Sequence, residues 1–221
     1  NYSGDALLTT YTWPDQRVAN AILMKFDLSG IPAGALVQNA TLHMALVEAD
    51  ATTDLTYTVT AHKLLRGNPD VATATGYTSD GVSGWTPNAC CSNNIPMAQA
   101  DISLAYDLQL VDQTPGDTSW NVTQMVLEWR ADPAGNLGLL LNSDTTALRD
   151  RYRNFASMEH PDATLRPFLE ITYSVPSAHV TPPVVSLTAP LSGAAVSDTT
   201  PVAAIASDNV GVAGVQFQLD G

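Results

Sequence analysis

Apolar and polar residues alternate with a period of two along most of the chain. Between residues 40 and 49, Leu42, Met44 and Leu46 alternate with polar or small neighbours, as expected for a strand with one buried face. The same period, or a short apolar run bounded by turn residues, predicts an antiparallel, all-β chain. The predicted strands are Ala6–Thr12, Val18–Asp27, Ala40–Ala49, Leu55–Leu65, Leu104–Val111, Leu137–Asn142, Phe155–Glu159 and Phe168–Tyr173.

One segment has a helical period instead. Val122, Met125, Val126 and Trp129 fall at positions i, i+3, i+4 and i+7, which places their side chains on one face of a helix. The pattern therefore predicts a short amphipathic helix at Thr123–Ala131.

Residues 67–100 follow neither period and are rich in Gly, Pro, Asn, Ser and Asp. An irregular segment of about 30 residues inside a compact domain is unusual and tends to be functional or disordered. Tyr77 and Trp85 lie in this segment, where exposure of their rings is plausible. Because sugar rings stack their C–H faces on exposed aromatic side chains, we predict that both bind a saccharide. Trp120 and Trp129 are predicted to be core residues.

Composition excludes several classes of protein. The 221 residues suffice for one large or two small domains, and 45% hydrophobic with 14% charged residues is typical of a folded chain. No apolar run approaches the roughly 20 residues of a membrane helix, so membrane insertion is not expected. Nine basic against 22 acidic residues give a net charge of −13, which disfavours nucleic-acid binding. Few lysines with many Thr, Ser, Asn and Asp favour an exported protein.

Four segments, in order along residues 1–174, resemble one family. They are Ala21–Ala33, Val37–Leu46, Trp120–Trp129, and Asn154–Tyr173 with its Phe-Ala-Ser-Met-Glu and Leu-Arg-Pro-Phe-Leu-Glu-Ile-Thr-Tyr runs. Together they resemble the DNRLRE (disaggregatase-related) modules, which are grouped as carbohydrate-binding family 96, although Asn121 stands where that family usually has Asp. The resemblance implies a jelly-roll-like antiparallel β-sandwich with one short helix, and a non-catalytic module. Members of the family are associated with alginate, which implies an acidic polysaccharide ligand.

The C-terminal part of the chain differs in composition. Residues 175–183 are rich in Ser, Pro, Ala and Thr, and we interpret them as a linker. Residues 184–221 resemble the first half of a bacterial immunoglobulin-like domain, with Ala-Ser-Asp-Asn-Val-Gly-Val and Val-Gln-Phe-Gln-Leu-Asp-Gly runs. Such a stretch makes roughly three strands where the sandwich needs about seven. Because the first strand of the DNRLRE module is also missing before Asn1, we expect the chain to be cut at both ends.

A cluster of arginines is the first candidate binding site. Arg149, Arg151 and Arg153 surround Tyr152, and in an extended segment the three guanidinium groups share one face. Guanidinium binds carboxylate or sulfate groups bidentately, so the cluster is predicted to hold successive acidic sugars. The alternative is a solvated loop whose arginines pair with nearby acids, namely Asp144, Asp150 and Asp162.

Phe155 constrains this arginine prediction. It has the same parity as Arg151 and Arg153 and is expected to face inward. Outward-facing arginines therefore require a bulge or a loop before the strand.

The two cysteines, Cys90 and Cys91, are adjacent. One interpretation is two reduced or separately placed side chains in a loop. The other is a vicinal disulfide in an oxidising compartment, which would form a rigid apolar plate and stabilise the fold little because the loop that it closes is minimal.

Motifs of catalysis and metal binding are absent from the sequence. No Gly-x-Ser-x-Gly elbow is present, and His43, His62, His160 and His179 are scattered without ligand spacing. We therefore predict that the chain is not an enzyme, although it could be the accessory module of one that degrades polysaccharides. Jelly-roll sugar binders often hold a structural calcium ion, but the sequence has no EF-hand-like run and assigns no ligand.

These observations predict a non-catalytic carbohydrate-binding module of an exported bacterial protein, secreted or at the cell surface, with an acidic polysaccharide such as alginate as its partner. The alternative is a structural or adhesive fibre subunit that assembles by strand addition at the open edges. A third interpretation is a fragment of a long multidomain enzyme whose catalytic part lies elsewhere. The sequence does not specify the polysaccharide, the state of the cysteines or the oligomeric state.

Overall fold

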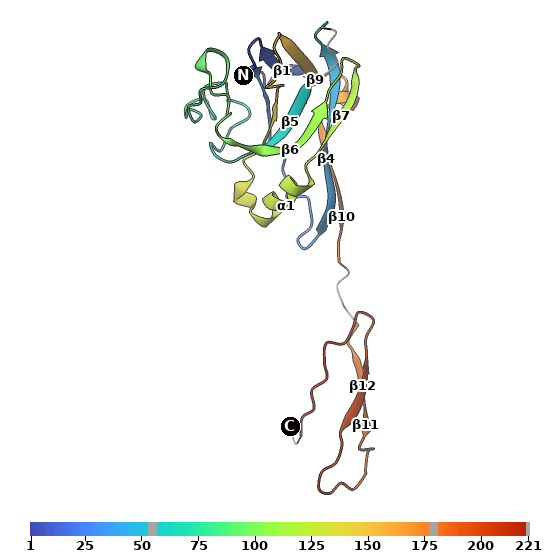
Figure 1. The fold of residues 1–221 in the computed structure, drawn as a ribbon. Helices are drawn as coiled ribbons and strands as arrows, with labels where there is room; N and C mark the ends of the chain where they lie inside the picture. The colour runs from blue at the N-terminus through green and yellow to red at the C-terminus, as the bar shows by residue number, and fades with distance from the viewer. Residues whose placement is uncertain (53–56, 177–180, 220–221) are drawn as a thin grey trace. The chain divides into compact units, whose positions relative to one another are not determined.

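The computed structural model describes residues 1–52, 57–176 and 181–219. These residues form two compact units, Asn1–Val175 and Pro176–Gly221 (Figure 1). The predicted start of a strand at Leu55, and residues 177–180 of the predicted linker, lie outside the described residues.

The first unit contains two antiparallel sheets, which confirms the predicted all-β fold. The first sheet has the order β10 (Phe168–Ser174), β4 (Leu36–Ala49), β9 (Arg151–Ala156), β1 (Leu7–Trp13) and β2 (Arg17–Asn20), and β7 (Gly116–Asn121) also pairs with β4. The second sheet has the order β3 (Ile22–Met24), β8 (Leu139–Asn142), β5 (Thr58–Leu64) and β6 (Ile102–Leu110).

The main core lies between the inner faces of these sheets. Leu42, Met44 and Leu46 of β4 are buried as their alternation predicts. Trp120 of β7 is fully buried, and its indole N–H donates a hydrogen bond of 2.9 Å to the Val59 carbonyl oxygen of the opposite sheet. The Phe155 ring of β9 packs edge-on against Trp120 at 5.9 Å between centroids.

The predicted helix is confirmed with its bounds, because α1 spans Thr123–Ala131. Met125, Val126 and Trp129 on its apolar face are buried. The described residues of the unit also contain three short 3₁₀ turns: η1 at Ser92–Asn94, η2 at Pro133–Gly135 and η3 at Ala163–Leu165.

The structure corrects three of the predicted elements. The strand predicted at Val18–Asp27 is two strands, because the chain passes from the first sheet to the second between Asn20 and Ile22. Strand β7 was missed, since its Gly-Asp-Thr-Ser-Trp-Asn sequence lacks apolar alternation and pairing with β4 sets its conformation. Strand β9 begins at Arg151, four residues before the predicted start at Phe155.

The second unit has two strands among its described residues, where the sequence predicted roughly three. Strand β11 (Val184–Ala189) pairs antiparallel with β12 (Ala203–Ser207), with Val184 opposite Ser207. Several of its large apolar side chains are exposed in this structure, including Val184, Leu187 and Ile205.

Candidate binding groove

The irregular segment between β5 and β6 is packed against the second sheet. Leu140 of β8 points away from the main core, to which its neighbours Leu139 and Leu141 belong. Leu140 forms a second apolar cluster with Leu64, Trp85 and Ala98. Strand β8 is therefore covered on both faces, and the segment is a fixed part of the unit.

Aspartate side chains organise the turns of this segment. The Asp80 carboxylate accepts hydrogen bonds from the backbone N–H of Val82 at 2.9 Å and of Ser83 at 2.5 Å. The Ser83 backbone hydrogen bond lowers the pKa of Asp80 below its ordinary value. Asp101 likewise accepts from the backbone N–H of Thr86 at 2.8 Å. The acidic, Gly-rich composition of the segment thus specifies turns, because such side chains substitute for backbone acceptors.

Trp85 is a structural residue of this segment. Its side chain is 5% exposed, and its indole N–H donates a hydrogen bond of 2.8 Å to the Thr75 carbonyl oxygen. Gly67 lies against the ring at a φ of +91°, and a Cβ atom there would approach Trp85 Cζ3 to 2.9 Å. The prediction that Trp85 is an exposed stacking platform is therefore wrong, because this ring fills the second apolar cluster.

A half-open groove of about 470 Å³ lies between the irregular segment and the strands β1, β2 and β3. The N-terminal residues form one wall and are tied to the segment. Asn1 Nδ2 donates a hydrogen bond to the Ala74 carbonyl oxygen at 2.6 Å, and Ser3 Oγ donates to that of Ala72 at 3.2 Å. Figure 1 shows the N-terminus beside this segment.

Two exposed phenol rings line the groove. Tyr77 on the irregular segment and Tyr2 on the N-terminal wall are each 59% exposed, and the edge of Trp85 also contributes to the lining. Within the described residues, neither tyrosine hydroxyl has a hydrogen-bond partner, and the carboxamide of the half-buried Asn20 has none either. The groove therefore combines apolar ring faces with uncharged polar groups that can bind a ligand.

The groove is electrically neutral in its side chains. Its other polar lining side chains are those of Asn1, Ser3, Thr9 and Thr75, and no Asp, Glu, Lys, Arg or His side chain belongs to its lining within the part of the chain that the structure describes.

The predicted arginine cluster does not form. Strand β9 runs without a bulge opposite β1, so Arg151, Arg153 and Phe155 all point inward. Arg151 is 2% exposed and Arg153 is 0% exposed. The prediction that the arginines share a solvent-exposed face is wrong, because the parity that they share with Phe155 places them inside.

Both buried guanidinium groups bind one carboxylate. Arg151 Nε lies 3.0 Å from Asp50 Oδ1, and Arg153 Nη1 lies 2.7 Å from Asp50 Oδ2. Arg153 Nε also donates to the carbonyl oxygens of Val111 at 3.0 Å and Asp112 at 2.8 Å. The Tyr57 ring lies 4.7 Å from Arg153 Cζ, a cation–π distance. We call Asp50, Tyr57, Arg151 and Arg153 the buried ionic centre.

Burial and pairing shift the pKa values in this centre. Burial raises the pKa of Asp50, but hydrogen bonds from the Tyr152 and Thr52 backbone and from Arg151 outweigh it, so the pKa lies below its ordinary value. Burial lowers the pKa of the Arg153 guanidinium and raises that of the Tyr57 hydroxyl. These contacts connect Asp50, which follows β4, with Arg151 and Arg153 of β9. They leave neither guanidinium group exposed to a ligand.

The side chains of Arg149 and Tyr152, the remaining members of the predicted cluster, are not part of the buried ionic centre. Arg149 is exposed on the loop before β9. Tyr152 is half-buried, and its ring meets that of Tyr11 edge-on at 6.3 Å. Tyr11 is the register partner of both Tyr152 and Asn20, so these three side chains share the outer face of the first sheet. Asn20 thus connects the groove with a pair of tyrosines.

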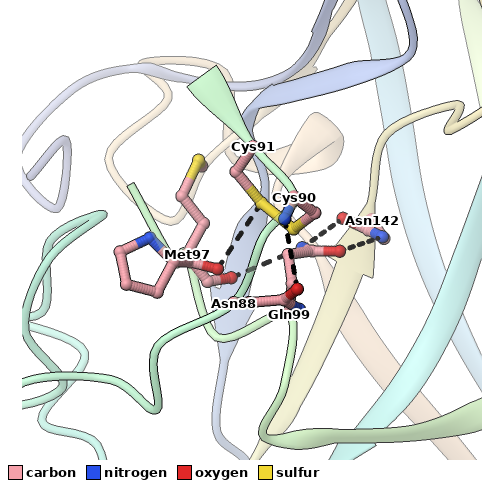
Figure 2. The surroundings of a disulfide bond; sticks show 7 residues. Asn88, Cys90, Cys91, Met97, Gln99 and Asn142 are labelled. Atoms are coloured by element: carbon pink, nitrogen blue, oxygen red, sulfur yellow. Dashed lines mark hydrogen bonds between the residues drawn. A yellow bond between two sulfur atoms is a disulfide. The ribbon is translucent and has the colours of Figure 1, made fainter. Parts of the chain in front are cut away.

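Cys90 and Cys91 are joined in a vicinal disulfide (Figure 2). Nearby, the side chains of Gln99 and Asn142 exchange two hydrogen bonds of 2.8 and 2.9 Å, which tie the segment to β8. The cysteines do not line the groove, but Ile95, Met97 and Ala98, which follow them, do. The bond therefore precedes, within a few residues, a part of the segment that lines the groove.

We expect the disulfide to contribute little to global stability. The Cys90→Ser/Cys91→Ser double variant should change the free energy of unfolding by less than about 1 kcal/mol, because a bridge between neighbours closes a minimal loop. Thiol titration of the denatured protein should detect free thiols only after reduction. Two thiols in the unreduced protein would contradict the presence of the bond.

A second hollow of about 400 Å³ lies over the outer face of the first sheet. His43 stacks on Phe168 there, with 4.6 Å between ring centroids, and His43 Nδ1 lies 2.9 Å from Asp117 Oδ2. Arg166 also lines this hollow, and its Nε donates to the His160 carbonyl oxygen at 2.9 Å. This face is charged, in contrast to the groove.

Within the described ranges, the structure has no group of three or more His, Cys, Asp and Glu side chains placed to hold a metal ion. The structural calcium ion stays a prediction, with no residue assigned to it.

Sequence reasoning found Tyr77 but missed Tyr2 and Asn20. Tyr2 precedes the first strand in a stretch without periodicity, so no local signal distinguishes it from any other terminal aromatic residue. Asn20 lies at the end of β2, within a stretch that reads as one continuous strand. Both line the groove together with residues of the irregular segment, which is distant from them in sequence.

Comparison with known proteins gives information on the second unit. Residues 183–221 match the family model of a bacterial Ig domain. Domains of this class are typical of extracellular or surface-associated bacterial proteins. The match does not extend to residues 1–174, whose resemblance to the DNRLRE modules gains no support from it. No curated protein matches the chain.

None of the helices in the described residues has the length and apolar character needed to cross a membrane.

Proposed function

We propose that the first unit is a non-catalytic carbohydrate-binding module of a secreted or cell-surface bacterial protein, and that its ligand lies in the groove between the irregular segment and β1–β3. The observation that carries the proposal is the pair of exposed phenol rings, Tyr2 and Tyr77, in a preformed groove of about 470 Å³. Ligand sites are typically concave, mostly apolar, and supplied with a few polar groups.

A sugar ring matches such a surface. Its C–H face packs on an aromatic ring, while its hydroxyl groups need donors and acceptors at the rim. The hydroxyl groups of Tyr2 and Tyr77 and the carboxamide of Asn20 supply both kinds of group, without a partner inside the described protein. The extracellular character of bacterial Ig domains is consistent with a glycan ligand outside the cell.

The chemistry of the lining supports the proposal of a non-catalytic module. Glycoside hydrolysis uses a pair of carboxyl groups, and general acid–base catalysis uses His, Glu, Asp or Lys within hydrogen-bond reach. No side chain of these types is among the described lining residues. The groove can hold a glycan, and its described lining offers no carboxyl, imidazole or amino side chain as an acid or base.

Replacing Tyr77 by alanine is expected to weaken glycan binding at least about tenfold, or about 1.4 kcal/mol, because it removes an exposed ring without disturbing the core. Binding should be measured by calorimetric titration of the full chain against soluble polysaccharides. The matched control is Tyr173→Ala on β10, which removes a tyrosine that is 40% exposed and outside the groove. Equal weakening by both variants, or an unchanged affinity for Tyr77→Ala, would contradict the proposal.

A structural or adhesive fibre subunit is the second candidate. It rests on the two-stranded sheet of the second unit, in which β11 and β12 pair only with each other among the described residues. Light scattering distinguishes the two functions: polymers that grow with concentration favour the fibre, whereas a monomer that binds glycan favours the module.

A further inference from the structure

We infer that the groove takes an uncharged saccharide chain rather than an acidic one. This inference rests on the proposed function and specifies the ligand class for the same groove. It departs from the acidic polysaccharide that the arginine pattern and the family resemblance implied, because it starts from the side chains that line the groove.

An acidic sugar needs a cationic partner, and no side chain in the described lining of this groove is cationic. A carboxylate that leaves water must be paired with a cation or bound by several N–H donors, and otherwise its desolvation opposes binding. None of the nine basic residues of the chain belongs to the described lining. The hydroxyl and carboxamide groups of Ser3, Thr9, Asn20 and Thr75 suit the hydroxyl groups of a neutral sugar instead.

Four of the nine basic residues are engaged elsewhere in the unit. Arg151 and Arg153 bind Asp50 in the buried ionic centre. Lys63 pairs with Glu128, and Arg166 lines the other hollow. At long range, the net charge of −13 repels a polyanion, whereas a neutral glycan experiences no such repulsion.

The surface next to the groove also disfavours an acidic ligand. From Asn20 the outer face continues to Tyr11 and Tyr152, so a chain of several sugar units finds further ring surface there. The Tyr11 hydroxyl donates a hydrogen bond of 3.1 Å to the Asp150 carboxylate. Burial, followed by this contact, raises the pKa of Tyr11. The Asp150 carboxylate repels a uronate at this position. Arg149, the residue before Asp150, is exposed and could attract a uronate instead, so replacing Arg149 tests the inference directly.

The test is a calorimetric titration of the full chain with two sets of hexasaccharides, at about 10 mM and about 150 mM salt, which changes the screening length severalfold. The uncharged set comprises cellohexaose, mannohexaose, xylohexaose and laminarihexaose. The acidic set comprises the hexamers of mannuronate, guluronate and galacturonate. We expect at least one uncharged probe to bind at least tenfold more tightly than any uronate, with a dissociation constant that changes less than twofold with salt.

Two variants make the outcome specific. Asn20→Ala should weaken binding of the uncharged probe about threefold to tenfold, and Arg149→Ala should leave it unchanged. Uronate binding that is tighter than neutral binding, falls with salt and is lost in Arg149→Ala would overturn this inference while the carbohydrate-binding function stands. No binding of either set by folded protein would overturn the proposed function, and the inference with it.

Discussion

Replacing Asp50 by alanine is expected to destabilise the first unit by about 3–5 kcal/mol, because it leaves two buried guanidinium groups without their carboxylate. Arg151 and Arg153 are 2% and 0% exposed, so neither can recover its hydration without unfolding. The free energy of unfolding should be measured in urea by tryptophan fluorescence. All four tryptophans, Trp13, Trp85, Trp120 and Trp129, lie in the first unit, so the signal reports on that unit alone.

Two variants control this result. Asp117→Ala removes an exposed carboxylate bonded to His43 and should cost less than about 1 kcal/mol. The triple variant Asp50→Leu/Arg151→Met/Arg153→Met removes all three charges together. It should recover much of the unfolding free energy that Asp50→Ala loses, because that loss is caused by buried charges without a partner. An Asp50→Ala variant as stable as Asp117→Ala would show that the buried ionic centre does not form.

The centre also has an expected pH dependence. The pKa of Asp50 is lower in the folded than in the unfolded protein, so its contribution is complete above the unfolded value of about 3.9. That contribution is lost as the pH falls through the folded pKa. The unfolding free energy of the Asp50→Ala variant should therefore fall less steeply with decreasing pH on the acid side than that of the unchanged protein.

Replacing Trp85 by alanine is expected to cost about 3–5 kcal/mol and to abolish glycan binding as well. The ring fills the cluster with Leu64, Ala98 and Leu140, and its N–H satisfies the Thr75 carbonyl oxygen. Its loss should detach the irregular segment from the second sheet and open the wall of the groove. Urea unfolding and calorimetric titration of the same sample measure the two effects.

Trp85→Phe is the matched control. It keeps most of the apolar volume but loses the indole hydrogen bond, so it should cost about 1–2 kcal/mol and retain binding. A Trp85→Ala variant that keeps full stability but loses binding would instead make the ring a ligand platform, as the sequence suggested.

Local pattern predicted most of the regular elements because each of these carries its own signal. The alternation of Leu42, Met44 and Leu46 and the helical spacing of Val122 to Trp129 do not depend on distant residues. The arginines show the limit of such reasoning. A shared face was correctly inferred for Arg151 and Arg153 but not for Arg149, which lies on the loop before β9. The side of the sheet on which the two arginines lie depended on Asp50, which is 101 residues from Arg151 in sequence. Phe155 carried the correct signal, because its parity already placed that face inside.

The groove was predictable only in part for the same reason. Its wall lies in the segment that lacks periodicity, and Tyr77 and Trp85 look alike there as exposed aromatic candidates. Which ring is buried depends on Leu140 of β8. The Leu140 side chain points away from the main core and packs against Trp85 in the second apolar cluster. Tyr2 reaches the groove through contacts of Asn1 and Ser3 with residues 72–74, and Asn20 reaches it at the end of β2.

The most direct test of the groove is a pair of ¹H–¹⁵N spectra of the full chain, without and with a saccharide that binds. The account predicts that chemical shifts change at Gly76 and Tyr77, at the Asn20 carboxamide and at the Trp85 indole N–H, and that resonances of the His43 and Phe168 hollow stay in place. Changes confined to that hollow, with the groove resonances unmoved, would contradict it.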